Sequence, residues 1–206
     1  SWHAVKVAFA NEVGRVAQRM GVSASKVHEI FVSDTKLNIS PYYTRPGGAF
    51  GGSCLPKDVR ALQNIAAEVG VSAPLVDSLL RSNEAHKNHQ FDLVARILPN
   101  GGRVLMAGLA FKAGTDDLRE SPNVDLARRL LNAGYDLRVY DPYLKPDKLR
   151  GQNLGYLYSA LPVVDRLLIG KTDAEAGTWD LLIESNATAR DLSLGATPVM
   201  STHAIA

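Results

Sequence analysis

Apolar residues in the first half of the chain recur three or four positions apart, which is the spacing of one face of a helix. Residues 2–20 show this pattern from Val5 to Met20, and residues 21–34 repeat it over a shorter stretch behind a serine cap. Residues 56–70 and 74–98 carry the same periodicity. The sequence therefore predicts four helices, with a long loop over residues 36–53.

The pattern changes after the segment PNGG at residues 99–102. The apolar run at 103–111 is typical of a buried parallel strand, residues 121–134 indicate a capped helix, and residues 135–142 follow as a second strand. Further strands are expected at three later apolar runs, residues 164–170, 179–185 and 197–200. Strands that alternate with helices predict an open parallel sheet.

We therefore expect an α/β protein in which a helical domain over residues 1–99 precedes an open α/β domain, with a mainly parallel sheet, over residues 100–206. The 206 residues are 46% hydrophobic and 21% charged, which is typical of a globular chain and excludes disorder. A net charge of +2 with scattered cations argues against a nucleic-acid partner, and no apolar run approaches the ~20 residues that cross a bilayer. We expect a cytoplasmic location and no membrane partner.

The single cysteine, Cys54, stands between a glycine-rich approach and the predicted helix at 56–70. One cysteine excludes an internal disulfide and a thiolate-rich metal site, and we expect no metal. Glycines let a ligand approach the main chain, while a helix N-terminus favours the thiolate, as does the cation of Lys57. Asp58 could assist a water or a substrate hydroxyl. The alternatives are that Cys54 is a buried small hydrophobe and that Asp58 only balances the helix charge.

The loop after the first predicted strand, FKAGTDDLRESP at residues 111–122, is a second candidate site. Ligands of open α/β sheets bind beyond the carboxyl ends of the strands, and Lys112 and Arg119 there could bind a phosphate beside the next helix. The alternative is a solvated loop in which these cations pair with the nearby Asp116, Asp117 and Glu120. No G-x-G-x-x-G follows a strand, so we expect no self-contained dinucleotide fold.

Taken together, FGGSCLPKD at residues 50–58 and AGLAFKAGTDDLRESP at residues 107–122 resemble the nucleotide-sugar 6-dehydrogenase family, the UDP-glucose and GDP-mannose dehydrogenases. The resemblance covers the central and C-terminal parts of the family's layout. It implies a helical dimerisation domain followed by a Rossmann-like nucleotide-sugar-binding domain. The family's N-terminal NAD-binding domain is expected to be absent from this chain.

The resemblance implies oxidation of the C6 alcohol of a sugar nucleotide to a carboxylate, with NAD as the cofactor. Cys54 would attack the C6 aldehyde to give a thiohemiacetal and then a thioester, and Asp58 would assist the hydrolysis. Lys57 and Arg119 would contact NAD. The implied substrate-binding residues are His3, Asn11, Tyr42, Tyr43, Arg45, Gly51 and Lys112.

The segment YYTRP at residues 42–46 is similar to the GDP-mannose branch of the family, so we expect GDP-mannose as substrate and GDP-mannuronate as product. The resemblance also implies a homodimer in which this loop completes the partner subunit's site, and it leaves a higher oligomer as an alternative. Gly48 departs from the bulkier residue expected there. The alternatives are a UDP-glucose dehydrogenase portion, a nucleotide-sugar-binding and dimerising fragment without activity, and a thiol redox protein. We expect the isolated chain not to oxidise GDP-mannose.

Overall fold

The computed structural model describes residues 2–38 and 46–202, and within them the chain forms two compact units. The first unit comprises Ser1–Arg45 and Leu55–Asn83, and the second comprises Pro46–Cys54 and Glu84–Ala206. The predicted domain boundary at residues 99 and 100 rests on a change of sequence pattern, whereas these units rest on spatial contacts. The domain boundary therefore stays a prediction, and each unit is described by itself.

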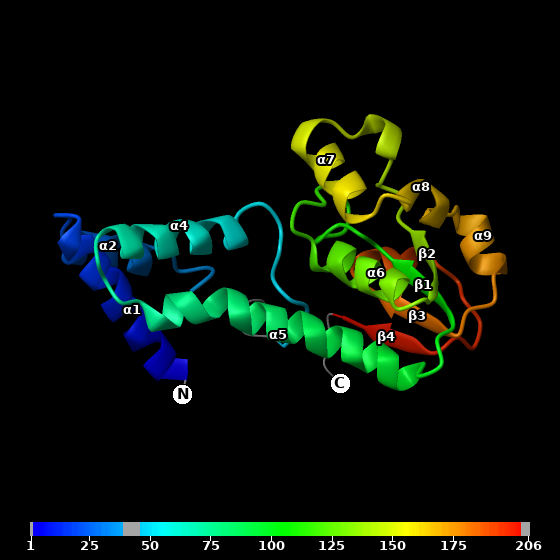
Figure 1. Cartoon of the computed structure of the whole chain (residues 1–206), viewed down its shortest axis with the longest axis horizontal. Helices are drawn as coiled ribbons and strands as arrows, with labels where there is room; N and C mark the ends of the chain where they lie inside the picture. Colours follow the sequence, from blue (N-terminus) through cyan, green and yellow to red (C-terminus); the bar gives the residue numbers. More distant parts are fainter. Residues whose placement is uncertain (1, 39–45, 203–206) are drawn as a thin grey trace. The chain divides into compact units, whose positions relative to one another are not determined.

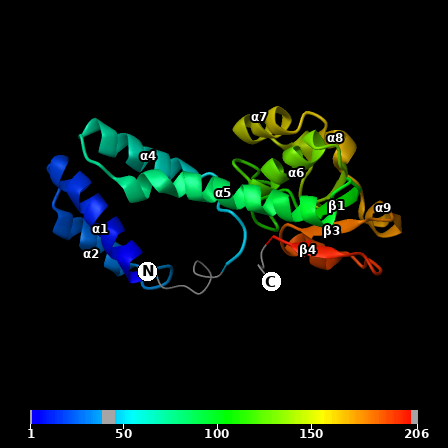
Figure 2. The same cartoon turned by 60° about the horizontal axis from the view of Figure 1, so that its bottom comes forward.

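The first unit is helical, as the periodicity predicted (Figure 1). It contains α1 (Trp2–Arg19), α2 (Ala24–Ser33), α4 (Leu55–Glu68) and the beginning of α5 (Pro74–Ile97). The Ser23 hydroxyl caps α2 by accepting a hydrogen bond from the Lys26 backbone, and α1 and α2 lie side by side (Figure 2). A small core of Val16, Ala66, Ala73 and Val76 joins α1, α4 and the start of α5.

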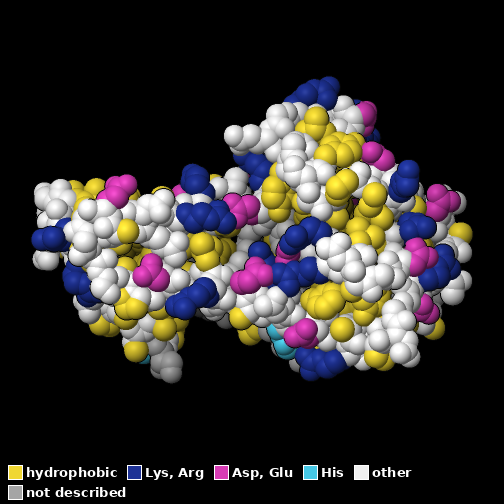
Figure 3. Space-filling model, viewed as in Figure 1, with side chains coloured by type: hydrophobic (Ala, Val, Ile, Leu, Met, Phe, Trp, Pro, Cys, Tyr) yellow, Lys and Arg dark blue, Asp and Glu magenta, His cyan; other side chains and the backbone are white. Residues whose placement is uncertain are grey.

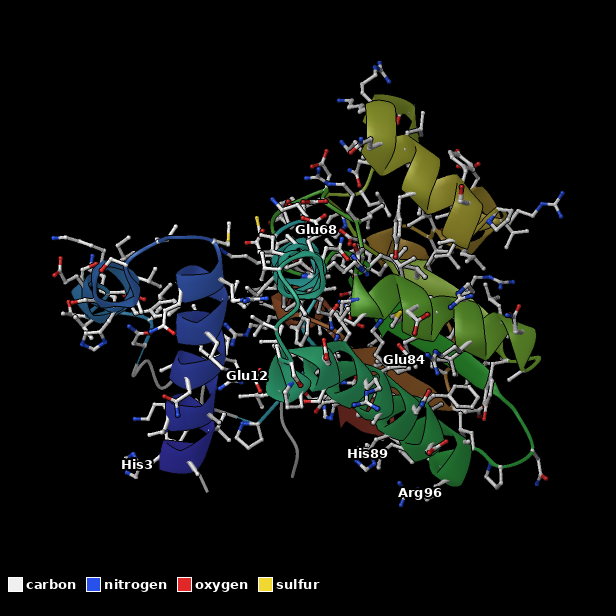
Figure 4. The ribbon with its side chains drawn as sticks, turned by 60° about the vertical axis from the view of Figure 1, so that its left-hand side comes forward. His3, Glu12, Glu68, Glu84, His89 and Arg96 are labelled. Atoms are coloured by element: carbon white, nitrogen blue, oxygen red, sulfur yellow. The ribbon has the colours of Figure 1, made fainter. Side chains whose placement is uncertain are left out.

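A buried carboxylate connects α1 to the N-terminus of α5. Glu12, which is 4% exposed, accepts hydrogen bonds from the backbone amides of Leu75 at 2.8 Å and Val76 at 3.0 Å (Figure 4). Amides in the first turn of a helix have no partner within the helix, and they carry its positive dipole end. Glu12 therefore caps α5 from a different part of the chain.

The second unit contains a four-stranded sheet in the order β2-β1-β3-β4, in which all pairings are parallel. Its strands are β1 (Arg103–Ala107), β2 (Asp136–Tyr140), β3 (Leu181–Glu184) and β4 (Val199–Ser201). Helix α6 (Pro122–Asn132), capped by Ser121, connects β1 to β2. The predicted fold class, a helical part followed by an open α/β part with a parallel sheet, is confirmed.

Both faces of the sheet are covered. Alternate residues of β1 face opposite sides: Val104 and Met106 join the core beneath α6, while Leu105 joins a second core around Trp179. The remaining helical segments are η1 (Pro146–Lys148), α7 (Gly151–Ala160), α8 (Val164–Leu167), α9 (Lys171–Ala176) and η2 (Ala187–Asp191). Among the residues described, no helix is both long and apolar enough to span a membrane.

One predicted strand, residues 164–170, is wrong. Its first part forms the short helix α8, and only Leu168 makes an isolated bridge, with Val139 of β2. The physical reason is the spacing of the buried residues: Val164 and Leu167 are both buried, and residues three apart share a face only in a helix. The expected strands at 103–111, 135–142 and 179–185 each contain a strand of the sheet, and the one expected at 197–200 overlaps β4.

The polar middle of α5, which carries many charged and amide side chains, packs against α6. Arg129 of α6 donates hydrogen bonds to the Glu84 carboxylate, to Asn88 Oδ1 at 2.5 Å and to Asp125 Oδ2 at 2.7 Å. Figure 3 shows acidic and basic side chains next to one another in this part of the second unit. These contacts attach the second half of α5 to the α/β unit.

Candidate functional site

The loop that carries Cys54 packs closely against the loop that follows β1, and both belong to the second unit. A Cβ added at Gly51 would lie 2.4 Å from the Glu120 carbonyl oxygen and 2.5 Å from Pro122 Cδ. Gly52 is buried at a φ of +82°, and a Cβ there would lie 3.4 Å from the Phe111 ring. The glycine backbone is therefore in direct contact with the second loop, at a distance that a side chain would prevent.

A histidine of α5 holds the start of the same loop. His86 Nε2 lies 2.6 Å from the Gly47 carbonyl oxygen. Because a carbonyl oxygen only accepts hydrogen bonds, the ring nitrogen donates. The segment before Cys54 is thus attached at one end to α5 and at the other to the loop after β1.

The Cys54 thiol is exposed and directly precedes Leu55, the first residue of α4. Its Sγ lies 3.8 Å from the Ser53 hydroxyl. Exposure excludes the alternative in which Cys54 is a buried small hydrophobe. It leaves the thiol accessible to a ligand or a reagent.

Arg119 forms a two-pronged ion pair with Asp117. Its Nε and Nη2 donate to the two carboxylate oxygens of Asp117, both at 2.9 Å, and its backbone amide donates to the same side chain at 3.1 Å. The hydrogen bond from Arg119 holds the pKa of the Asp117 carboxyl below its usual value. The pKa of Arg119 is raised, first by its hydrogen bond to Asp117, then by that carboxylate's charge and, more weakly, by the charge of a Cys54 thiolate.

The backbone around this ion pair is held by Asn153 of α7. Asn153 Oδ1 accepts from the Leu118 amide at 2.9 Å, and its Nδ2 donates to the Asp116 carbonyl at 2.6 Å. The two bonds flank Asp117 on either side. One amide side chain therefore fixes the stretch of loop that presents Asp117 and Arg119.

The carboxyl ends of the central strands are closed by the chain's own polar side chains. The buried Asp141, which follows β2, accepts from the amides of Leu109 at 2.9 Å and Tyr143 at 3.1 Å, and burial raises its pKa. Asn186 donates to the Ala110 carbonyl at 3.1 Å. The Leu109 amide and the Ala110 carbonyl, which follow β1, are therefore both bonded to side chains of the chain itself.

The predicted site residues fall into three groups. Gly51, Cys54, Lys112 and Arg119 belong to the second unit, where the packed loops bring Gly51, Cys54 and Arg119 together and Lys112 is exposed. His3, Asn11, Lys57 and Asp58 belong to the first unit. Tyr42, Tyr43 and Arg45 lie outside the described residues. The functional roles assigned to all of these residues stay predictions.

Within the first unit, His3 is exposed near the start of α1 (Figure 4). Asn11 is exposed further along α1 and lines an open cavity of about 400 Å³ between α1 and α2. Lys57 and Asp58 pair with each other at 3.4 Å in the first turn of α4, with both side chains about two-thirds exposed. In residues 2–38 and 46–202, no group of three or more His, Cys, Asp or Glu side chains is placed to hold a metal ion.

Three residues near this site were not predicted to act there. Asp117 was named only in the alternative of a solvated loop whose cations pair with nearby carboxylates. The signal for its pairing with Arg119 is their spacing of two residues in the segment TDDLR. Asn153 and His86 have no local sequence signal, because each contacts a segment at least 35 residues away. Tertiary structure alone identifies them.

Comparison with known proteins gives two matches to one family. The central domain of the UDP-glucose/GDP-mannose dehydrogenase family matches residues 1–85, and the UDP binding domain of the same family matches residues 105–182. A GDP-mannose 6-dehydrogenase from Pseudomonas putida is 47% identical over 185 residues, which cover 90% of this chain and 42% of that protein. A UDP-glucose 6-dehydrogenase from Rickettsia bellii is 30% identical over 171 residues, covering 80% of this chain and 39% of that protein.

Solved structures agree with the sequence matches. A crystal structure of a ternary complex of GDP-mannose dehydrogenase from Pseudomonas aeruginosa superposes with a TM-score of 0.85 at 41% identity, over 98% of this chain and 47% of that one. A UDP-glucose dehydrogenase from Pyrobaculum islandicum gives a TM-score of 0.66 at 30% identity, over 98% of this chain and 45% of that one. The chain spans less than half the length of these relatives.

Proposed function

Because the chain belongs to the UDP-glucose/GDP-mannose dehydrogenase family and carries its central and UDP binding domains, we propose that it is the cysteine-bearing, substrate-binding portion of a GDP-mannose 6-dehydrogenase. The observation that carries the proposal is the exposed Cys54 thiol, on a loop whose glycines pack closely against the loop that carries Arg119. The choice of GDP-mannose is supported by identities of 44–47% to GDP-mannose 6-dehydrogenases, against 30–31% to two UDP-glucose 6-dehydrogenases.

In the proposed reaction, the Cys54 thiolate attacks the C6 aldehyde of the sugar nucleotide, and the new S–C bond gives a thiohemiacetal. NAD, when bound, accepts the hydrides that the oxidation of C6 releases. Water then hydrolyses the resulting thioester to the carboxylate of GDP-mannuronate and frees the thiol. Asp58, exposed at the start of α4, would orient that water or take its proton.

The residues proposed to contact NAD are cations, as its diphosphate requires. Arg119 is 41% exposed although paired with Asp117, and Lys57 is 69% exposed, so both can reach a ligand. His3, Asn11, Gly51 and Lys112, together with Tyr42, Tyr43 and Arg45, are proposed to contact the sugar nucleotide. Their accessibility supports the proposal where the structure describes them, since His3, Asn11 and Lys112 are all exposed.

We also propose a homodimer that shares its active sites through residues 42–46. Support comes from the apolar side chains left exposed on α1 and α2, among them Val7 at 60%, Ile30 at 71% and Val32 at 56%. Apolar surface of this kind on a small helical unit is typical of an interface. A cytoplasmic location is part of the same proposal.

The test is alkylation of Cys54 by iodoacetamide, followed by mass spectrometry, with GDP-mannose, UDP-glucose or no ligand present. Because Cys54 is the only cysteine, every alkylated molecule reports on this site. We expect GDP-mannose to slow the reaction and UDP-glucose to have little effect. Protection by UDP-glucose instead would reassign the substrate, and no protection by either nucleotide would contradict the proposed site.

A further inference from the structure

We propose that Asp117 is a positioning residue that fixes the guanidinium of Arg119 beside the Cys54 thiol, with Asn153 holding the loop on which both residues stand. The proposal rests on the proposed function only in taking Cys54 as the reacting group. The positioning itself can be measured without substrate or cofactor.

The ion pair between Asp117 and Arg119 has a geometry that fixes the guanidinium. Both donors on one edge of the Arg119 guanidinium, Nε and Nη2, are bonded to Asp117 at 2.9 Å, and the Arg119 amide is bonded to the same carboxylate. A two-pronged bond sets the plane of the guanidinium as well as its position. Arg119 is 41% exposed, so without Asp117 its long side chain would sample many rotamers in solvent.

The backbone that carries the ion pair is held by Asn153. Asn153 bonds to the residue on each side of Asp117, the Asp116 carbonyl and the Leu118 amide. The loop is thereby tied to α7. Asp117 and Asn153 thus constrain, respectively, the side chain and the backbone of the segment that ends at Arg119.

The loop that carries the Cys54 thiol packs against the loop that carries Arg119. Gly51 packs on the Glu120 carbonyl, the residue directly after Arg119, and Gly52 packs on Phe111. These contacts place the Cys54 loop against the loop that carries Arg119, and the charge of a Cys54 thiolate acts on Arg119. A cation held there draws anionic reagents toward the sulfur.

The test compares the rates at which Cys54 reacts with anionic iodoacetate and neutral iodoacetamide at one pH and low salt. The ratio of the two rates reports the local positive potential and cancels changes in general thiol access. We expect Arg119→Gln to lower the ratio roughly two- to fivefold, the size of a surface charge interaction. Asp117→Asn should lower the ratio by a similar factor, although removal of a negative charge would by itself raise it.

Three comparisons separate positioning from charge and from folding. Asp116→Asn removes the same charge from an exposed neighbour and should not lower the ratio. Asn153→Leu leaves every charge in place and should lower it, whereas Gln152→Leu, at an exposed position of the same helix, should not. Asp117→Asn added to Arg119→Gln should cause no further fall, because its effect passes through Arg119. The midpoint of urea unfolding checks that each variant is folded.

The proposal is overturned if Arg119→Gln leaves the ratio unchanged, if Asp117→Asn behaves like Asp116→Asn, or if Asp117→Asn lowers the ratio equally in the presence and absence of Arg119. If Asp117→Asn does not fold, Asn153→Leu against Gln152→Leu decides. Protection of the wild-type thiol by GDP-mannose is measured in parallel. If GDP-mannose does not protect the thiol but the rate ratios are as predicted, the proposed function is rejected and the positioning role stands. If GDP-mannose protects the thiol but the ratios are not as predicted, the positioning role is rejected and the proposed function stands.

Discussion

Replacing Gly51 with alanine tests the contact that places Cys54. The added Cβ would lie 2.4 Å from the Glu120 carbonyl oxygen and 2.5 Å from Pro122 Cδ, about 1 Å inside ordinary van der Waals contact. Neither obstacle is the far end of a flexible side chain: one is backbone, and the other is the ring of a buried proline in the first turn of α6. The loops must therefore separate or distort.

Overpacking of this kind costs about 1–3 kcal/mol, and we expect Gly51→Ala to lower the unfolding free energy of the second unit by that amount. Urea unfolding followed by Trp179 fluorescence measures it, in a Trp2→Phe background because the chain has two tryptophans. Trp179 is buried in a core of the second unit and reports on that unit. The iodoacetate to iodoacetamide ratio of Cys54 should fall in the same variant, since the thiol moves relative to Arg119.

The matched control is Gly195→Ala in the same unit. A Cβ there meets no atom within 4 Å, so its effect should stay within about 0.5 kcal/mol. If Gly51→Ala matches Gly195→Ala in both unfolding free energy and alkylation ratio, the close packing of the two loops does not position Cys54.

Three further predictions concern stability. Gly155→Ala, in the middle of α7 with open space around it, should raise the unfolding free energy by about 0.5–1 kcal/mol, measured by urea unfolding. Glu12→Ala should destabilise the first unit by about 1–3 kcal/mol, because two amides of α5 lose their acceptor; a change below 0.5 kcal/mol in thermal or urea unfolding would show that water replaces the carboxylate. The pKa of Asp117 lies below its ordinary value of 3.8, so the stability that its ionised form adds is present above pH 3.8 and is lost as the pH falls through the lower, folded value. The difference between wild type and Asp117→Asn should therefore be constant from pH 7 to pH 5 and shrink only below pH 3.8, and a decline already at pH 5 would contradict the strong pairing.

Much of the fold could be predicted because its signals are local. The helix of α2 begins at a serine cap, α6 begins at Ser121 and Pro122, and β1 is a short apolar run. The prediction of a strand at 164–170 was wrong because a short apolar segment fits both the helix and the strand periodicity. Only packing on the sheet selected the helix α8. Local propensity does not contain that information.

The candidate site divides in the same way. Cys54, Gly51 and Arg119 were predicted from the chemistry of their segments and the resemblance those segments carry. Asn153 and His86 could not be predicted, because each acts by bonding to the backbone of a distant loop. Nothing in the neighbouring sequence distinguishes them from other polar residues of similar size. The supporting residues of a site are set by tertiary contacts, whereas its reacting groups are set by chemistry.

The central claim is that Cys54 is the nucleophile for the C6 aldehyde of a GDP-sugar, and its most direct test is the reaction itself. The C6 aldehyde of GDP-mannose, labelled with ¹³C at C6, is mixed with the chain and followed by NMR. Formation of a thiohemiacetal converts the labelled carbonyl and hydrate signals into a new signal from a carbon bonded to sulfur. We predict that signal with the wild-type chain and its absence with Cys54→Ala. Identical spectra for the two proteins would contradict the account.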